Sequence, residues 1–286
     1  MERFSQTFAS VREHFGAWLR VALILIILSC LFFVAGGGVS HNEKWRINQI
    51  NISGTDMGTS EQIHALVGEM LEGNYYFVYA RNNSHLIPIN EIEKSLLETY
   101  PRLLSTLVSR TNEHTISIAV TERKPYALWC GEVFHPELSA LPDCWFIDSD
   151  GFIFDEAPMF SRGVYIYVYG KLNEKNSGEI LQSTLPSGRY VFADNFAKLI
   201  QTNIGKPFQI EISPEGQYSM TILSSSQHPF LGWVTIRFDA ESSAETLLKN
   251  LTSSIAVQFP DNLPHKKQLL YIDMRFGNKV IFGFEE

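Results

Sequence analysis

The feature that most constrains this chain is an apolar stretch near its N-terminus, Val21–Val39, which contains no Asp, Glu, Lys or Arg. As a helix, these roughly 19 residues rise about 28 Å, close to the roughly 30 Å hydrocarbon core of a bilayer. A buried helix of a soluble protein is usually shorter and has a polar face. A cleaved signal peptide has an apolar region of about 7–15 residues before small residues such as those at Ala35–Gly38. The stretch predicts an uncleaved membrane anchor, with these two readings as alternatives.

The charges on either side of this stretch predict its orientation. Arginines stand before it at positions 3, 12 and 20, and Lys44 and Arg46 follow it. Lys and Arg are in excess on the cytoplasmic side of a span, and a large following domain crosses the membrane whatever its own charge. We therefore expect residues 1–20 to form a cytoplasmic tail, residues 21–39 a single transmembrane helix, and the remainder to be extracytoplasmic.

Net charge and cysteine content narrow the function further. The net charge is −8 at pH 7, and no cluster of Lys and Arg offers a nucleic-acid surface. Cys30 lies within the apolar stretch, whereas Cys130 and Cys144 each stand at the edge of a strand-like run. In an oxidising compartment these two can close a short loop, but the sequence leaves the pairing open. No Cys or His neighbours stand at ligand spacing, so we expect neither a metal nor another cofactor.

The segment at residues 45–124 predicts a small sheet covered by two helices, in the order β-α-α-β-β. Trp45–Ser53 alternates as a strand does. Thr59–Gln62 has the spacing of a capping box before one helix, and Asn90–Glu93 has it before a second helix that ends at Pro101. A loop carrying the aromatic residues 75–77 is expected between the helices. Two further strands are predicted at Leu103–Arg110 and Thr115–Glu122.

The segment at residues 125–284 predicts a mostly antiparallel β domain with flanking helices. Trp145–Phe154 contains two short strands around a turn, with Gly151 where a positive φ is favoured. Further strands are expected at Val164–Gly170, Phe208–Ile212, Tyr218–Leu223, Trp233–Phe238, Leu269–Phe276 and Lys279–Phe284. One helix is marked by Phe192, Phe196, Leu199 and Ile200 and ends near Gly205, and another is expected at about Ser242–Val257. The chain as a whole is therefore assigned to the α+β class.

Four features in a fixed order resemble the FtsQ/DivIB family of bacterial cell-division proteins. The β-α-α-β-β segment resembles a POTRA domain, a polypeptide-binding module. The run VTERKPYALW at Val120–Trp129 directly follows it. The hairpin at Trp145–Phe154 and the LLYIDMRF segment at Leu269–Phe276 complete the set. The resemblance covers the chain from the anchor to the C-terminus, and departs from the family in the insert Gly131–Asp143 and in a last strand that ends almost at the terminus.

This resemblance implies a non-catalytic scaffold of the bacterial divisome. The family is single-pass in the inner membrane and is enriched at the division septum. The resemblance implies FtsB/FtsL-like partners at the C-terminal strand, other divisome membrane proteins at the POTRA-like domain, and a link to septal peptidoglycan synthesis. A POTRA-containing transport or secretion component is the alternative. A membrane-anchored hydrolase is disfavoured because the sequence has no G-x-S-x-G, phosphate-loop or H-E-x-x-H motif.

The last strand is the candidate partner-binding site. An edge strand presents unpaired N–H and C=O groups that a partner's extended segment can satisfy. From the pattern alone, the strand could equally lie inside the sheet; the resemblance favours the edge. The candidate residues are Arg275, Phe276, Lys279, Val280, Ile281, Phe282 and Phe284.

Overall fold

The structure is a computed structural model that describes residues 2–134, 143–173, 180–260, 267–277 and 279–285, with the side chains of residues 2–17 and 57 excepted. It is of the α+β class, with five α-helices and mixed sheets in the described residues. The chain forms two compact units, Met1–Glu122 and Arg123–Glu286. This division falls two residues before the end of the segment predicted as the first domain.

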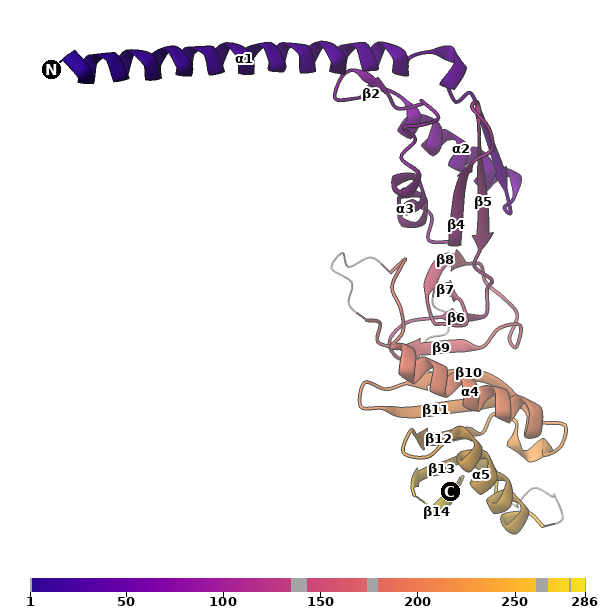
Figure 1. Cartoon of the computed structure of the whole chain (residues 1–286). Helices are drawn as coiled ribbons and strands as arrows, with labels where there is room; N and C mark the ends of the chain where they lie inside the picture. Colours follow the sequence, from indigo (N-terminus) through magenta and orange to yellow (C-terminus); the bar gives the residue numbers. More distant parts are fainter. Residues whose placement is uncertain (1, 135–142, 174–179, 261–266, 278, 286) are drawn as a thin grey trace. The chain divides into compact units, whose positions relative to one another are not determined.

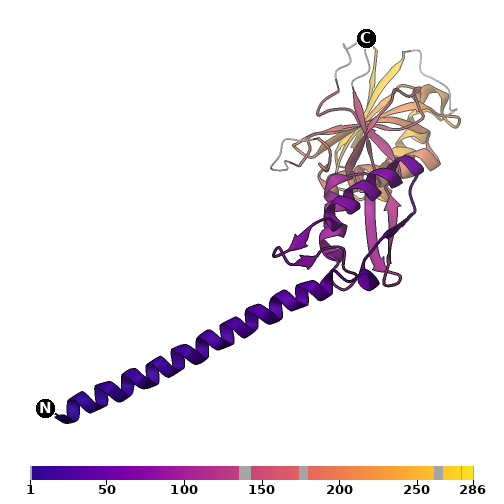
Figure 2. The same cartoon turned by 90° about the horizontal axis from the view of Figure 1, so that it is seen from above.

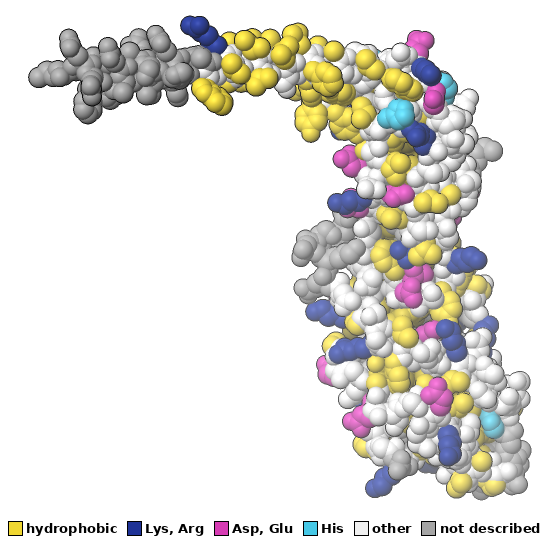
Figure 3. Space-filling view, viewed as in Figure 1, with side chains coloured by type: hydrophobic (Ala, Val, Ile, Leu, Met, Phe, Trp, Pro, Cys, Tyr) yellow, Lys and Arg dark blue, Asp and Glu magenta, His cyan; other side chains and the backbone are white. Residues whose placement is uncertain are grey.

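The first unit begins with one continuous helix, α1, at Glu2–Ser40 (Figures 1 and 2). Its part Trp18–Ser40 has a mean hydropathy of 2.6 and is long and apolar enough to cross a membrane; among the described residues it is the one helix that is. Its large apolar side chains are exposed rather than packed in a core (Figure 3). A helix of this kind at an N-terminus is a membrane span or a signal sequence.

A three-stranded sheet, two helices, a two-stranded hairpin and a 3₁₀ turn form the rest of the first unit (Figure 1). The elements are the 3₁₀ turn Glu43–Trp45, β1 Gln49–Ser53, α2 Met57–Leu71, β2 Asn74–Tyr75, β3 Tyr79–Ala80, α3 Ile89–Thr99, β4 Leu103–Arg110 and β5 Thr115–Glu122. The sheet order is β1-β5-β4, with β1 parallel and β4 antiparallel to β5. Both helices pack on one apolar cluster with β5, through Ile63, Val67, Ile92, Leu96 and Ile118. The predicted strands β4 and β5 are confirmed.

The predicted helix starts in this unit are wrong in detail. Helix α2 begins after Asp56, whose carboxylate accepts the N–H of Thr59 at 2.8 Å. The same bond lowers the pKa of Asp56. Helix α3 begins after Pro88, whose side chain has no acceptor to cap it, so Asn90 lies inside the helix. The carboxylate of Glu93 instead accepts the N–H of Val108 in β4 (2.8 Å). Leu97 of α3 is apolar but 38% exposed.

Two local features of the first unit differ from the expected loops and strands. The predicted strand Trp45–Ser53 begins only at Gln49, because Glu43–Trp45 forms a 3₁₀ turn capped by Asn42. The expected aromatic loop is instead the tip of a short antiparallel hairpin, β2–β3.

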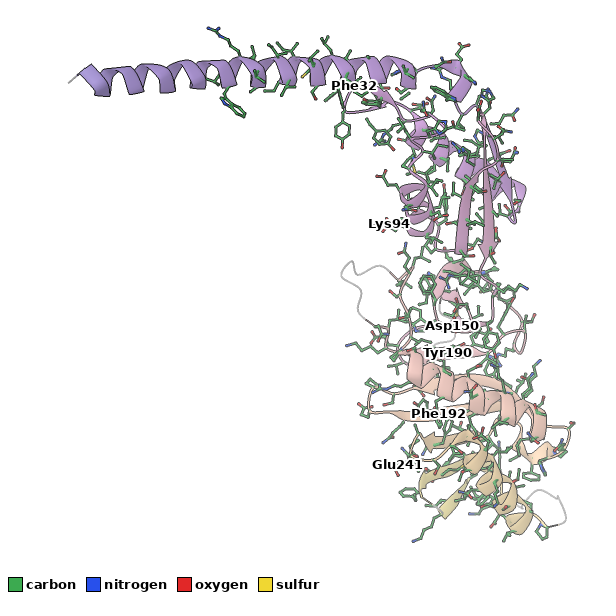
Figure 4. The ribbon with its side chains drawn as sticks, viewed as in Figure 1. Phe32, Lys94, Asp150, Tyr190, Phe192 and Glu241 are labelled. Carbon is green, nitrogen blue, oxygen red and sulfur yellow. A yellow bond between two sulfur atoms is a disulfide. The ribbon has the colours of Figure 1, made fainter. Side chains whose placement is uncertain are left out.

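A nine-stranded sheet with two helices on one face makes up the second unit (Figure 1). Its strands are β6 Ala127–Trp129, β7 Cys144–Ile147, β8 Ile153–Ala157, β9 Tyr167–Gly170, β10 Lys206–Ile212, β11 Gln217–Ser224, β12 Thr235–Asp239, β13 Leu269–Phe276 and β14 Lys279–Phe284; its helices are α4 Ser187–Asn203 and α5 Ala244–Gln258. Tyr190 and Phe192 of α4 are labelled in Figure 4. A short 3₁₀ turn, Pro229–Leu231, precedes β12. Both helices contribute to the core that covers this face, with Phe196 and Leu251 fully buried.

The sheet order is β14-β13-β12-β11-β10-β9-β6-β7-β8. Among these described strands, five neighbouring pairs are antiparallel, and the pairs β12–β13, β9–β10 and β6–β9 are parallel. The sheet is therefore mixed, with antiparallel pairs in the majority as expected. Helix α4 lies in the connection from β9 to β10 and helix α5 in that from β12 to β13, whereas β6 connects to β9 through the β7–β8 hairpin.

The strand boundaries of the second unit follow backbone turns that the alternation pattern does not reveal. Strand β9 starts at Tyr167 rather than Val164, because Val164 ends a turn in which its N–H donates to the carbonyl oxygen of Ser161 (3.3 Å). Strand β12 starts at Thr235 because Trp233 has a φ of 65°. The hairpin β7–β8 forms as predicted, with Gly151 at a φ of 78°.

A disulfide joins Cys130, which follows β6, to Cys144, which begins β7. Both cysteines are buried. Most of the insert Gly131–Asp143 lies outside the described residues. The bond closes the base of this insert, at a sequence separation of 14 residues.

Candidate partner-binding edge

The candidate site is built on the terminal hairpin, β13–β14. The residues KVIFGF alternate, and Gly277 supplies the positive φ (65°) with which the chain leaves β13; Asn278 lies outside the described residues. Strand β14 pairs antiparallel with β13, with Ile281 opposite Asp273 and Phe282 opposite Ile272. Among the strands of the described ranges, β14 has a neighbour on one side only, so it lies at an edge of the sheet.

The hydrogen bond of Glu285, the residue that follows β14, shows which backbone groups of the strand point toward the sheet. Glu285 donates its N–H to the carbonyl oxygen of Gln268 (2.9 Å), toward the sheet. Backbone groups of successive strand residues point to opposite edges. The N–H and C=O groups of Ile281 therefore point toward β13, and those of Val280 and Phe282 point outward, where a further strand can pair with them.

The opposite edge of the sheet, at β8, is partly paired with another segment of the chain. Ile153 donates its N–H to Ser183 and accepts the N–H of Gln182, both at 2.9 Å. A further bridge joins Phe152 to Thr184. The chain thus covers the beginning of β8 with its own backbone.

The side chains of β14 separate into two faces, as their alternation predicts. Val280, Phe282 and Phe284 pack against the core beneath α5, and the ring of Phe282 lies edge-on to that of Phe259, with 5.8 Å between centroids. On the other face Ile281 is 44% exposed and Lys279 is exposed. Phe276, at the end of β13, is 54% exposed. A charge at Phe282 would therefore disturb the core, and Ile281 is the better probe of this edge.

Arg275 is held by the sheet itself. Its guanidinium donates to both carboxylate oxygens of Asp273, from Nε at 2.9 Å and from Nη2 at 2.6 Å, and Nη1 donates to Gln217 in β11 (2.5 Å). The Asp273 side chain is 6% exposed and that of Arg275 is 28% exposed. These hydrogen bonds hold the pKa of Asp273 below its usual value, against the opposing effect of burial. Arg275 therefore joins its own strand β13 to β11, which lies two strands away in the sheet.

A close contact between Tyr271 of β13 and Gly283 of β14 was not predicted from the sequence. The ring of Tyr271 lies over Gly283, where an added Cβ would come within 2.3 Å of the ring, and Arg237 of β12 stacks on the same ring at 4.4 Å. The glycine between Phe282 and Phe284 was the available signal, since a glycine inside a strand often marks a close approach.

The candidate edge presents backbone hydrogen-bonding groups together with apolar side chains. Within the described ranges, no group of three or more His, Cys, Asp or Glu residues is placed to hold a metal ion. What the edge provides is a row of backbone donors and acceptors, a core-facing aromatic row and an apolar side chain on the open face. No protein-family model matches this sequence, and no curated protein matches it significantly.

Proposed function

We propose that this protein is a non-catalytic, membrane-anchored scaffold that captures an extended polypeptide segment on β14. The observation that carries the proposal is the contrast between the two sheet edges. Within the part of the chain that the structure describes, no strand pairs with the outer side of β14, whereas β8 is partly covered by residues 182–184. Backbone pairing at an edge strand supplies affinity, and alternate side chains supply selectivity.

The family resemblance supplies the proposed partners and place of action. By that resemblance, β14 receives FtsB/FtsL-like coiled-coil proteins, and the POTRA-like first unit contacts other divisome membrane proteins. The chain would then link early division proteins to septal peptidoglycan synthesis, with residues 21–39 of α1 in the inner membrane and the segments 45–124 and 125–284 outside the cytoplasm. The apolar length of α1 supports the anchor. The Cys130–Cys144 disulfide supports an oxidising compartment, where such bonds persist.

The side-chain test is capture of an FtsB/FtsL-like pair by the full chain in detergent. Ile281→Glu places a charge on the open face of β14 without entering the core. We expect capture to weaken by at least about tenfold, because a charge beside a pairing strand must be desolvated or displaced. Leu107→Glu, at a residue that is 64% exposed on β4, is the matched control and should leave capture unchanged. Equal capture by wild type and Ile281→Glu would contradict the proposal.

The backbone test separates strand pairing from side-chain contact. Val280→Pro removes an outward N–H, which an edge strand tolerates, and we expect capture to be lost with little change in the thermal unfolding midpoint. Ile281→Pro removes an N–H that points into the β13–β14 ladder and should instead destabilise the hairpin. Undiminished capture by Val280→Pro would show that the partner does not pair with β14.

A further inference from the structure

The β2–β3 hairpin is docked on the last turns of α1. Tyr79 donates its hydroxyl hydrogen to the carbonyl oxygen of Phe33 (3.0 Å), and the two rings pack edge-to-face with 5.0 Å between centroids. Val78 fills the space over Gly37, where an added Cβ would lie 1.9 Å from Val78 Cγ1. Two glycines in succession, Gly36 and Gly37, thus let the hairpin approach the helix closely.

Hydrogen bonds fix the base of the hairpin to the end of the same helix. The Ser40 hydroxyl accepts the N–H of Ala80 (3.1 Å), and the Ser40 carbonyl accepts from the side-chain amide of Asn83 (2.8 Å). His41 Nε2 lies 3.1 Å from the Asn74 side-chain oxygen. The hairpin is therefore attached rigidly to α1 along the segment from Phe33 to Ser40.

This attachment lies inside the stretch that is apolar enough to span a membrane, Trp18–Ser40. Phe33 precedes Ser40 by seven positions, which is about 10 Å along a helix axis. If the window fills a hydrocarbon core of roughly 30 Å, the hairpin contacts α1 at the depth of the outer leaflet and its headgroup boundary. Figure 4 labels Phe32, an 83% exposed side chain of this part of α1.

The tip of the hairpin consists of two strongly exposed aromatic residues with a left-handed backbone. Tyr76 and Phe77 are 79% and 97% exposed, and have φ values of 48° and 64°. Val78 donates its N–H to Tyr75 (3.0 Å), which makes a type I′ turn. Such turns normally use Asn-Gly, because large side chains are strained in left-handed backbone. Neither the strain nor the exposure is offset by packing within the described protein.

We propose that Tyr76 and Phe77 insert into the outer headgroup and acyl boundary of the membrane that α1 spans. Aromatic side chains favour this boundary, where the rings are buried and polar atoms stay hydrated. Insertion offsets the turn strain and gives the first unit a second attachment beside α1, which fixes its height and tilt at the lipid surface. This inference rests on the membrane-anchoring part of the proposed function.

Spin-label depth measurement on the full chain tests the proposal. The chain is reconstituted in vesicles of phosphatidylethanolamine and phosphatidylglycerol, and a nitroxide is attached at Phe77→Cys in a Cys30→Ser background with the disulfide intact. We expect a label at residue 77 to be accessible to oxygen and shielded from a polar nickel chelate. The matched control, Leu107→Cys on β4, should show the opposite accessibility.

A nitroxide on native Cys30, which is exposed within α1, tests separately whether α1 spans the membrane and whether the hairpin tip inserts into it. A label at Cys30 that is accessible to oxygen but not to the nickel chelate is in lipid, and a label with the opposite accessibility is in water. A label in lipid at Cys30 and in water at residue 77 would overturn the aromatic insertion and leave the anchor intact. Water-like accessibility at both positions would overturn the anchor and the insertion together. Because residue 77 is almost fully exposed, its substitution should not affect folding.

Discussion

The Asp273–Arg275 pair allows the construction of the candidate edge to be tested quantitatively. Arg275→Met keeps most of the aliphatic stem of the side chain and removes the guanidinium. Asp273 then loses the hydrogen bonds at 2.9 and 2.6 Å and keeps only the backbone N–H of residue 275, at 3.1 Å. Its carboxylate is left almost buried beside β14.

The expected cost lies between two limits. Removing one partner of a fully buried pair costs about 3–5 kcal/mol, whereas an exposed pair contributes about 0–1 kcal/mol. Asp273 is buried but the Arg275 side chain is 28% exposed, so we expect about 2 kcal/mol, which corresponds to a roughly 30-fold change in the opening equilibrium. The double variant Asp273→Asn/Arg275→Met should lose less than the sum of the two single variants, because no charge remains unpaired.

Hydrogen exchange of the β13 amides in the detergent-solubilised chain measures this opening locally. The pH dependence gives a second readout. Since the pKa of Asp273 is lowered in the folded state, its contribution is present above the unfolded value of 3.8 and is lost as pH falls through the lower folded pKa. In Arg275→Met that loss should begin at higher pH, and Asp273→Asn should lack it.

If the β13 amides exchanged at the same rates in Arg275→Met as in the wild type, the Arg275–Asp273 hydrogen bonds would not stabilise this strand. If capture of an FtsB/FtsL-like partner were lost while exchange stayed unchanged, Arg275 would contact the partner directly. The structure instead predicts that both change together, because the guanidinium positions β13, on which β14 is built.

Three further substitutions test other contacts. Gly283→Ala forces the opposing tyrosine ring away and should cost about 1–3 kcal/mol, measured as faster exchange in β14. Phe282→Ala removes a partly buried ring from its contact with Phe259 and should cost about 2 kcal/mol by the same measurement, less than a fully buried phenylalanine. Replacing Cys130 and Cys144 by serine should lower the free energy of unfolding of the second unit by about 3 kcal/mol, measured by denaturant titration, since the bond closes a loop of this size.

Local alternation predicted the antiparallel hairpins well. β4 and β5 occur at the expected residues, and the terminal strands β13 and β14 have the expected boundaries. In each case neighbouring residues along the chain carry the signal, because a hairpin pairs segments close in sequence. The face assignment within β14 followed from the same alternation.

Features that depend on distant partners were not predictable in this way. The parallel pairing of β12 with β13 and of β9 with β10 joins strands separated by helices. Gln217 lies 58 positions before Arg275, and only the folded sheet brings them together. The β2–β3 turn was missed for a different reason: it uses Tyr-Phe where the recognisable turn signal is Asn-Gly.

The composition of β14 strengthens the case that its outer side is a binding surface. Edge strands invite aggregation, and proteins usually protect them with proline, several charges, a bulge that twists the strand away, or a covering segment. KVIFGF has one lysine at its first position and no proline, and its outward backbone groups at Val280 and Phe282 belong to a strand with an apolar core face. The register shifts of this hairpin leave extra residues in β13 rather than β14, so the alternation of the outer strand stays regular. A strand kept regular, apolar and at the edge is suited to pairing, and an occupant that completes the sheet would remove the liability that its exposure creates.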